Sequence, residues 1–346
     1  MQNGIVLAAF GQLAYLVQAV LALASVRQHS DLPVTLVTDQ SEHPLLCGAG
    51  FDSIVQLDPK TTAAMPHDFA LPLLARVEAL RLSPYDITLS LDVDARLRKP
   101  DLQRLFDVCK KADIAVAPCL LDTSRERAMY DRPLWNNGVI LYKQSAVVIK
   151  MFESFEALFS EHLRVATTPD AKADCLNHIP GVDTRKRLLC SDQIALAQIF
   201  SPVVNTFNLK YAHLPEHWNW RGGNSNRVCA EDVIIDHHPN IRNETFNQLA
   251  DCAFDLLSSG EAAKSALYYD CALTALDPGL LQLSPAQHFE RLADFADLQS
   301  VLGRLRGVKI DAQSASLLAV ALFHQRTQPR SGKALSILNG LAKTLK

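Results

Sequence analysis

Apolar runs that suit β-strands alternate with stretches of helical periodicity over the first 240 residues of the chain. An apolar run at 5–10 ends at a glycine, and the residues after it repeat hydrophobic side chains at the spacing of a helix. A second apolar run at 33–38 then predicts another strand. Strand, helix and strand in this order are the unit that opens a parallel sheet.

The same alternation continues along the chain. Further strands are predicted at 86–91, 114–117, 138–142 and 232–236, and further helices at 69–82, 100–111, after 142 through 159, and at 192–200. Residues 121–133 and 161–189 show no clear period and are predicted as loops. A structureless segment as long as the second is often a lid or a binding loop. The fold class expected is therefore α/β.

Beyond residue 241 the strand signals disappear and helical periodicity remains. We therefore expect a sheet domain over 1–240 and an all-helical extension over 241–346. Residues 262–278 resemble the second helix of a tetratricopeptide repeat, although the sequence does not repeat clearly with the 34-residue period of such units. The extension could pack against the sheet domain, or it could form a docking surface for another protein.

Composition narrows the class of partner. The chain has 346 residues, 34 Lys and Arg against 37 Asp and Glu, and a net charge of −3, which argues against a nucleic-acid partner. Its 8 cysteines lack C-x-x-C spacing, which favours free thiols in a reducing compartment. The uncharged stretch 5–26 has no Lys or Arg before it, so it does not suit a signal peptide. We expect a cytoplasmic protein without a transmembrane segment.

The strongest chemical feature is a D-x-D sequence at the end of a predicted strand, Leu89-Ser-Leu-Asp-Val-Asp94. Ligands in open α/β sheets bind beyond the carboxyl ends of the strands. Alternation along an extended strand would put Asp92 and Asp94 on one side. Mg²⁺ and Mn²⁺ take oxygen ligands and often keep positions for substrate phosphates. Two carboxylates therefore suit a metal–diphosphate complex.

Other motifs accompany the D-x-D in a fixed order. They are Arg76, Trp135-Asn-Asn-Gly138, Ser191-Asp-Gln193, His217-Trp-Asn219 and Asp232-Val-Ile-Ile-Asp-His237. In order and spacing the set resembles the GT-A fold glycosyltransferases, in particular the family-8-like group of nucleotide-diphospho-sugar transferases. The resemblance covers roughly residues 3–240 and implies a Rossmann-like mixed sheet flanked by helices.

The resemblance also implies roles for individual residues. Asp92, Asp94 and His237 would bind Mn²⁺ or Mg²⁺, and Asp192 and Gln193 would lie beneath the reacting carbon. The residues it assigns to the nucleotide-sugar donor are Phe10, Gly11, Tyr15, Asp39, Arg76, Asp92, Val93, Asn136, Asn137 and Gly138. The donor implied is a UDP-sugar, transferred with retention to a carbohydrate, lipid or protein acceptor. If the reaction inverts instead, a carboxylate must deprotonate the acceptor, and Asp192 is the candidate. Trp135 and Trp220 are candidates for a wall of the sugar or acceptor site, because aromatic faces pack on sugars.

The chain departs from the family pattern near its late histidine. The sequence there is His237-His238-Pro239-Asn240, so the lysine that stabilises the departing phosphate is missing. Arg221, Arg227 and Arg242 are candidates to replace it. Either histidine could be the metal ligand, and His237 is favoured because it directly follows the predicted strand.

Two other functions compete with the glycosyltransferase hypothesis. A nucleotidyltransferase could use a similar sheet, but no glycine-rich basic loop that would hold a triphosphate follows the first strand. A non-catalytic nucleotide-sugar-binding or scaffold protein could have a degenerate sheet domain. The presence of the D-x-D, the N-x-G, the D-Q pair and the late histidine argues against it.

Overall fold

The computed structural model describes residues 2–11, 13–58, 70–118, 135–201, 207–221 and 229–237, and single positions between 253 and 265. The chain divides into two compact units, Met1–Pro239 and Asn240–Lys346. The proposed all-helical extension, the loop at 121–133, and residues Arg227, His238 and Arg242 lie outside the described residues. The extension and the domain boundary at residue 240 therefore stay predictions.

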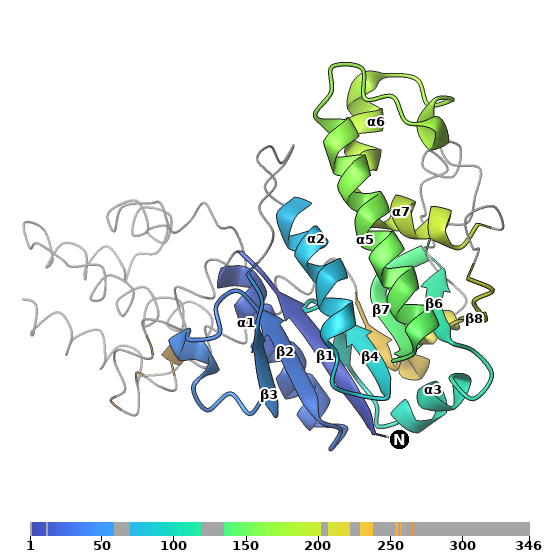
Figure 1. Cartoon of the computed structure of the whole chain (residues 1–346). Coiled ribbons are helices and arrows are strands. Elements are labelled where there is room, and N and C mark those ends of the chain that lie inside the picture. The colour runs from blue at the N-terminus through green and yellow to red at the C-terminus, as the bar shows by residue number, and fades with distance from the viewer. Residues whose placement is uncertain are drawn as a thin grey trace, which may run out of the picture. The chain divides into compact units, whose positions relative to one another are not determined.

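A seven-stranded mixed sheet forms the centre of the first unit (Figure 1), in the order β3-β2-β1-β4-β7-β6-β8. Strands β1 to β4 are parallel, β7 is antiparallel to both β4 and β6, and β8 is parallel to β6. The strands are β1 (Asn3–Ala9), β2 (Val34–Thr38), β3 (Ser53–Gln56), β4 (Ile87–Leu91), β6 (Ile114–Pro118), β7 (Trp135–Lys143) and β8 (Tyr211–His213). A second, two-stranded antiparallel sheet pairs β5 (Arg96–Leu97) with β9 (Ile235–Asp236).

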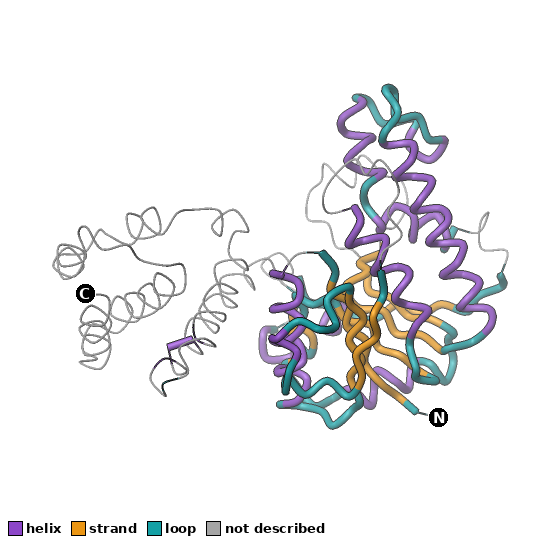
Figure 2. The backbone as a smooth tube through the Cα atoms, turned by 60° about the vertical axis from the view of Figure 1, so that its left-hand side comes forward, coloured by secondary structure: helices purple, strands orange, loops and turns teal. Residues whose placement is uncertain are grey.

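Helices cover both faces of the large sheet, as the turned view in Figure 2 shows. The α-helices are α1 (Leu13–Arg27), α2 (Ala70–Ala79), α3 (Leu102–Val108), α5 (Ala146–Ala166), α6 (Val182–Leu189) and α7 (Asp192–Ile199). Short 3₁₀ turns lie at Pro44–Leu46, Leu80–Leu82, Asp174–Leu176, Glu216–Trp218 and Ala230–Asp232. Helices α2, α5 and α7 share one hydrophobic core with β6 and β7. The expected α/β class, a mixed sheet flanked by helices, is confirmed.

Helix α5 shows how the sequence builds this core. Ser145 caps its start, because the Ser145 side chain accepts a hydrogen bond from the Val148 N–H. Apolar side chains then recur three and four residues apart and are fully buried, at Val148, Met151, Phe152, Phe155 and Phe159. Burial of these five apolar side chains on one helix stabilises the fold by roughly 10 kcal/mol before conformational entropy is counted.

The strand order reverses at β1, because β2 lies on one side of it and β4 on the other. In open α/β sheets such a reversal leaves a crevice outside the carboxyl ends of the strands, where ligands bind. Strand β7 runs antiparallel to β4, with Leu91 opposite Val139. The beginning of β7 therefore lies at the same edge of the sheet as the end of β4.

The sequence predictions for the first unit need correction at several elements. The predicted loop over 161–189 is wrong, since α5 runs to Ala166 and α6 occupies Val182–Leu189. The predicted strand at 138–142 is too short, because β7 already begins at Trp135. The short strands β3, β5 and β8 were not predicted. Each has four residues or fewer, and β3 and β8 alternate only weakly between buried and exposed positions.

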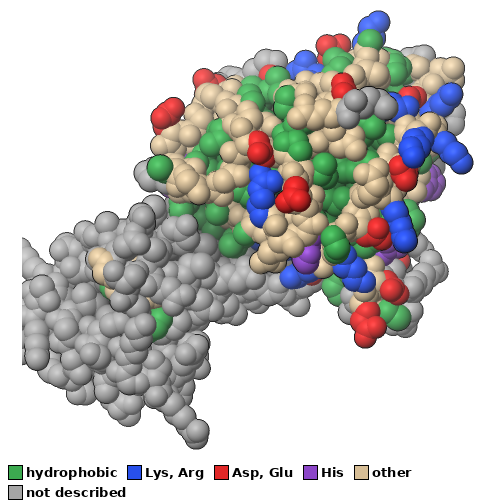
Figure 3. Space-filling view, turned by 90° about the horizontal axis from the view of Figure 1, so that it is seen from below, with side chains coloured by type: hydrophobic (Ala, Val, Ile, Leu, Met, Phe, Trp, Pro, Cys, Tyr) green, Lys and Arg blue, Asp and Glu red, His purple; other side chains and the backbone are tan. Residues whose placement is uncertain are grey.

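The surface bears charges of both signs. On the face of the first unit seen in Figure 3, basic and acidic side chains are interspersed. Among the described residues, no helix combines the length and the apolar character needed to cross a lipid bilayer. The apolar stretch at 5–26 forms β1 and α1, as its pattern predicts.

Candidate metal centre and active site

The D-x-D segment forms a tight turn after β4. The Asp92 N–H donates to the Gly138 carbonyl of β7 at 2.7 Å, and the Ala95 N–H donates back to the Asp92 carbonyl at 2.9 Å. The two carboxylates do face one region, as expected. The reason is this turn, rather than the alternation of an extended strand.

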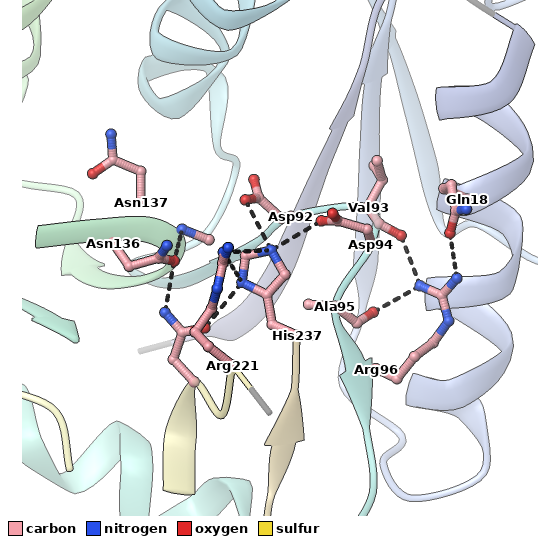
Figure 4. A network of polar contacts seen from close by, with 12 residues as sticks. Gln18, Asp92, Val93, Asp94, Ala95, Arg96, Asn136, Asn137, Arg221 and His237 are labelled. Carbon is pink, nitrogen blue, oxygen red and sulfur yellow. Dashed lines mark hydrogen bonds and ion pairs between the residues drawn. The ribbon is translucent and has the colours of Figure 1, made fainter. Parts of the chain in front are cut away.

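His237 completes a cluster with these carboxylates (Figure 4). Its Nε2 atom lies 3.1 Å from Asp94 Oδ1 and 3.5 Å from Asp92 Oδ2. One ligand atom from each of the three residues lies within 4.8 Å of the others. Neighbouring ligands of an octahedral Mg²⁺ ion are about 3 Å apart, because its bonds are about 2.1 Å long. The two carboxylates and the spacing of the cluster thus fit a hard divalent cation, and the imidazole nitrogen is a donor that first-row transition metals also accept.

Backbone pairing places His237 in this cluster. Strand β9 pairs with β5, so that Asp236 lies opposite Arg96. On its other side the Trp220 N–H donates to the Ile235 carbonyl at 2.9 Å, and the His237 N–H donates to the Trp220 carbonyl at 2.8 Å. The Arg98 guanidinium also pairs with Asp236 at 2.7 Å. The histidine therefore follows a short strand that is held on both edges.

A chain of buried amides reaches the other side of the histidine ring. His237 Nδ1 lies 3.0 Å from Asn219 Oδ1, and Asn219 Nδ2 donates to Asn136 Oδ1 at 2.8 Å. The Gly138 N–H donates to the same Asn136 oxygen at 2.8 Å. Asn136, Asn219 and His237 are 2%, 3% and 4% exposed, so bulk water does not compete for these bonds. The ring also lies directly against Gly138, where a Cβ atom would overlap it.

Arg76, in the last turn of α2, links three segments of the site. Its Nε lies 2.7 Å from Asp92 Oδ1, and its Nη1 lies 3.2 Å from Asp192 Oδ2 at the start of α7. Its Nη2 donates to the Asn137 carbonyl of β7. The planar guanidinium suits such multiple contacts, because its donors have a fixed geometry. Arg76 therefore fixes Asp92 relative to β7 and α7.

The charges around the site shift the pKa values of two carboxyl groups in opposite directions. Burial raises the pKa of Asp94, but the neighbouring His237 and the charges of Arg96 and Arg221 outweigh it and hold this pKa well below its usual range. Burial also raises the pKa of Asp192, and the charge of Arg76 only partly offsets it. The Asp94 side chain is still 48% exposed, so a ligand can reach it, whereas Asp192 is enclosed at 8%.

The turn after β1 contains the residues expected at the nucleobase. Gly11 has a φ of +79°, and its N–H donates to both carboxylate oxygens of Asp39, at 3.0 Å and 3.2 Å. The Phe10 ring is buried in the core, so only the backbone of this residue can meet a ligand. Gln40, which the motifs did not indicate, donates from Nε2 to the Gly11 carbonyl at 3.3 Å. Tyr15 is half-buried near the start of α1.

The remaining predicted residues differ in how accessible they are. Trp135 lies in the core, where its ring packs edge-on against Phe200 and His213, and its role as a sugar or acceptor wall stays a prediction. Trp220 and Gln193 are half-buried, and Val93 is buried in the turn between the two aspartates. Asn136 and Asn137 point to opposite sides of β7 (Figure 4), as successive residues of a strand do.

The sequence predicts the roles of two residues of the site only in part. Asn219 belongs to the motif His217-Trp-Asn219, but the sequence assigns it no role, because nothing in its spacing links it to His237. Arg221 was one of three arginines proposed to replace the missing lysine. Its Nη1 lies 3.4 Å from Nε2 and 3.5 Å from Nδ1 of His237, which places its charge at the cluster.

Comparison with known proteins gives structural similarity alone. No family model matches the chain, and no curated protein matches it in sequence. The galactosyltransferase LgtC, solved with donor and acceptor sugar analogues, is similar at 15% identity and a TM-score of 0.44, over 69% of this chain and 87% of that one. The glycosyltransferase GlyE of Streptococcus pneumoniae TIGR4 is similar at 17% identity and 0.41, over 68% and 55%. Mouse xyloside xylosyltransferase 1 is similar at 14% identity and 0.42, over 68% and 97%. All three are glycosyltransferases, the class that the motifs of this chain resemble.

Proposed function

We propose that this chain is a metal-dependent glycosyltransferase of the GT-A type, which moves a sugar from a nucleoside-diphosphate sugar to an acceptor. The observation that carries the proposal is the convergence of Asp92, Asp94 and His237 at the carboxyl edge of the sheet, with ligand atoms within 4.8 Å of one another. Ligands bind at this edge in open α/β sheets. The position of this cluster and the chemistry of its ligand atoms therefore both support the proposal.

Asp92, Asp94 and His237 would hold Mn²⁺ or Mg²⁺, with the remaining positions left for the donor's phosphates. When bound, the cation supplies positive charge that stabilises the departing diphosphate. Arg76 keeps Asp92 oriented through their 2.7 Å contact. The low pKa of Asp94 keeps this ligand ionised at neutral pH.

We propose that Arg221 stabilises the departing phosphate in place of the missing lysine. Its side chain is exposed, and its guanidinium lies beside the His237 ring. A fixed positive charge at this place stabilises negative charge that develops on a leaving phosphate. An arginine also offers two parallel donors to a phosphate, which a lysine does not.

Asp192 and Gln193 are proposed to line the reacting sugar from below. The transition state of sugar transfer resembles an oxocarbenium ion, which a nearby carboxylate or amide oxygen stabilises. Asp192 is enclosed and paired with Arg76 at 3.2 Å, an arrangement that suits electrostatic support better than proton abstraction from an acceptor. This supports transfer with retention. A UDP-sugar as the donor rests on the resemblance of the motifs.

A donor screen tests the proposal. UDP-, GDP- and CMP-sugars are added with and without Mn²⁺ or Mg²⁺, and thermal unfolding is followed. A ligand at about 100 times its Kd stabilises by about 2.7 kcal/mol, which raises the Tm by about 5 °C or more for a unit of this size. We expect the shift to require the metal and to be lost in Asp94→Ala. The matched control is Asp107→Ala on α3, whose carboxylate pairs with Lys110 away from the cluster.

The outcomes separate the competing functions. Metal-dependent binding of one nucleotide sugar, followed by its hydrolysis or transfer, supports the glycosyltransferase. Formation of a new diphosphate bond from a nucleoside triphosphate would instead identify a nucleotidyltransferase. Nucleotide-sugar binding without turnover in any acceptor mixture would favour a binding protein. A Tm shift that survives Asp94→Ala would contradict the proposed metal site.

A further inference from the structure

We propose that Asn136 and Asn219 are positioning residues that fix which ring nitrogen of His237 carries its proton. They do so through a chain of hydrogen bonds that begins at the backbone of Gly138. The effect is to turn the lone pair of His237 Nε2 toward Asp92 and Asp94. The inference rests on the proposed function in one respect, because the ion that uses this lone pair is the one proposed there.

The chain of bonds has a fixed direction at its beginning. A backbone N–H can only donate, so the Gly138 N–H, 2.8 Å away, identifies the Asn136 atom that it meets as the oxygen. The orientation of the Asn136 amide therefore does not depend on a choice between its oxygen and its nitrogen, which have nearly equal size.

The direction then passes to Asn219. The Asn136 oxygen accepts a second hydrogen bond at 2.8 Å, which only the amide nitrogen of Asn219 can donate. The oxygen of Asn219 is consequently the atom that faces His237 Nδ1, at 3.0 Å. An amide oxygen only accepts, so Nδ1 must carry the hydrogen. In a neutral imidazole the other nitrogen, Nε2, then has the free lone pair.

The opposite side of the ring shows why this tautomer matters. Nε2 faces Asp94 Oδ1 at 3.1 Å and Asp92 Oδ2 at 3.5 Å. Three lone pairs that converge on one small region repel one another unless positive charge offsets them, as the Arg221 guanidinium 3.4 Å from Nε2 does in part and a bound cation would do fully. The tautomer that Asn219 selects is thus the one that a metal ion requires.

The burial of Asn136 and Asn219 strengthens their preference for one tautomer of His237. Asn136 and Asn219 are at most 3% exposed, and a buried polar group that loses its partner pays the full cost of desolvation. Reversing the His237 tautomer would leave the Asn219 oxygen without a donor. The hydrogen on Nε2 would then be donated to Asp94 and would occupy the lone pair that a cation needs. Loss of such an outer partner typically weakens metal binding 10- to 100-fold.

The test compares three variants of the full chain. Asn219→Leu removes both hydrogen bonds at similar volume. Asn219→Asp keeps an acceptor for His237 Nδ1 but has no N–H for the Asn136 oxygen, so it removes only the bond to Asn136. Asn177→Leu is the matched control, because Asn177 is exposed and bonds only to Asp174 among the described residues. The tautomer is read from the ¹⁵N NMR signals of the His237 ring in histidine-labelled, metal-free protein over a series of pH values. Mn²⁺ affinity is measured by calorimetry.

We expect the wild type, Asn219→Asp and Asn177→Leu to show protonated Nδ1 and free Nε2 at His237. In Asn219→Leu we expect a mixture of tautomers and Mn²⁺ affinity 10- to 100-fold lower. Protonated Nε2 in the wild type overturns the proposal, and so does an Asn219→Leu variant that folds with unchanged tautomer and affinity. If Asn219→Leu does not fold, the wild type and Asn219→Asp decide.

The same measurements keep this proposal apart from the proposed function. Wild-type protein that binds no Mn²⁺ but shows protonated Nδ1 contradicts the metal-dependent function and supports the assignment of the tautomer. Protein that binds Mn²⁺ tightly with protonated Nε2 before metal is added contradicts the role of Asn136 and Asn219 and leaves the function standing.

Discussion

Gly138 gives the His237 ring the space that it occupies. A Cβ atom at this position would overlap the imidazole and lie 2.8 Å from the Asn136 side-chain oxygen. We therefore expect Gly138→Ala to displace the ring, to lower the free energy of unfolding by roughly 1–3 kcal/mol, and to reduce Mn²⁺ affinity at least tenfold. Urea denaturation and calorimetry measure the two effects.

Gly4→Ala provides the control for this substitution. A Cβ at Gly4 would overlap the Tyr85 ring, far along β1 from the metal cluster. It should lower stability by a similar amount without changing the affinity for Mn²⁺. Equal Mn²⁺ affinities in the two variants would contradict the contact between Gly138 and His237.

Arg76→Lys tests whether one guanidinium must hold three segments together. A lysine has one point of charge, so it cannot reach Asp92, Asp192 and the Asn137 carbonyl at the same time. We expect affinity for the donor to fall at least tenfold and turnover at least a hundredfold, since small displacements in an active site cost about this much. Steady-state kinetics and nucleotide binding are the measurements.

Arg81→Lys is the matched control for Arg76. Arg81 is 24% exposed and pairs with Glu156 on α5. Its replacement should lower stability slightly and leave donor binding and turnover unchanged. A similar kinetic loss in both variants would show that the effect of Arg76→Lys comes from the fold rather than from the site.

At the scale of residues, the sequence predicts which charged side chains form the site better than it predicts the residues that surround them. Asp92, Asp94, Arg76 and His237 do meet, because short motifs specify residue types at strand and helix ends. The role of Asn219 could not be predicted, since its contacts with Asn136 and His237 span 83 and 18 residues. The place of Trp135, which lies in the core, could not be predicted, because a tryptophan suits either the core or a binding wall.

At the scale of elements, β7 explains how the site is assembled. A parallel strand beside β4 would bring its carboxyl end to the D-x-D. Strand β7 is antiparallel, so its first residues, Asn136 to Gly138, arrive there instead. The apolar pattern predicts that this segment is a strand. It does not predict the direction of the strand, because alternation is the same either way.

The helices α5 and α7 enclose a histidine that should make stability depend on pH. His162 on α5 is 3% exposed, and its Nε2 lies 3.3 Å from Gln198 on α7. Burial lowers the pKa of His162 from 6.5 to about 4, and Gln198 and Glu161 only partly oppose this. Between these two pH values the unfolded chain binds a proton that the folded chain does not.

Stability contributed by neutral His162 is therefore complete above about pH 6.5 and is lost as pH falls toward 4, by up to roughly 3 kcal/mol. Urea denaturation at a series of pH values measures this loss. In His162→Gln the free energy of unfolding should fall less over the same pH interval, because most of the loss due to His162 is absent. An identical decline in the variant and the wild type would show that His162 is not the group responsible.

At the scale of the whole molecule, the first unit contains every described residue of the proposed site. We propose that a chain ending at residue 240 folds by itself and binds Mn²⁺ as the full chain does. A chain ending at residue 230 lacks β9 and His237, and β5 loses its partner. It should bind Mn²⁺ at least a hundredfold more weakly and unfold at a lower temperature.

Circular dichroism on heating and calorimetry with Mn²⁺ compare the two shortened chains with the full one. If the chain ending at residue 240 does not unfold cooperatively, the proposed domain boundary is wrong. If the chain ending at residue 230 keeps its Mn²⁺ affinity, His237 is not a ligand.

The pairing of β9 with β5 also bears on how the protein folds. The bond between Arg98 and Asp236 joins residues 138 positions apart, whereas β1 and β2 pair across one helix. Contacts between distant parts of a chain form late, because closing a long loop costs entropy before any contact repays it. We expect the metal cluster to be the last part of the sheet unit to form during refolding. Mn²⁺ would then bind only to molecules that have completed the fold, and the rate of its uptake would report the final step.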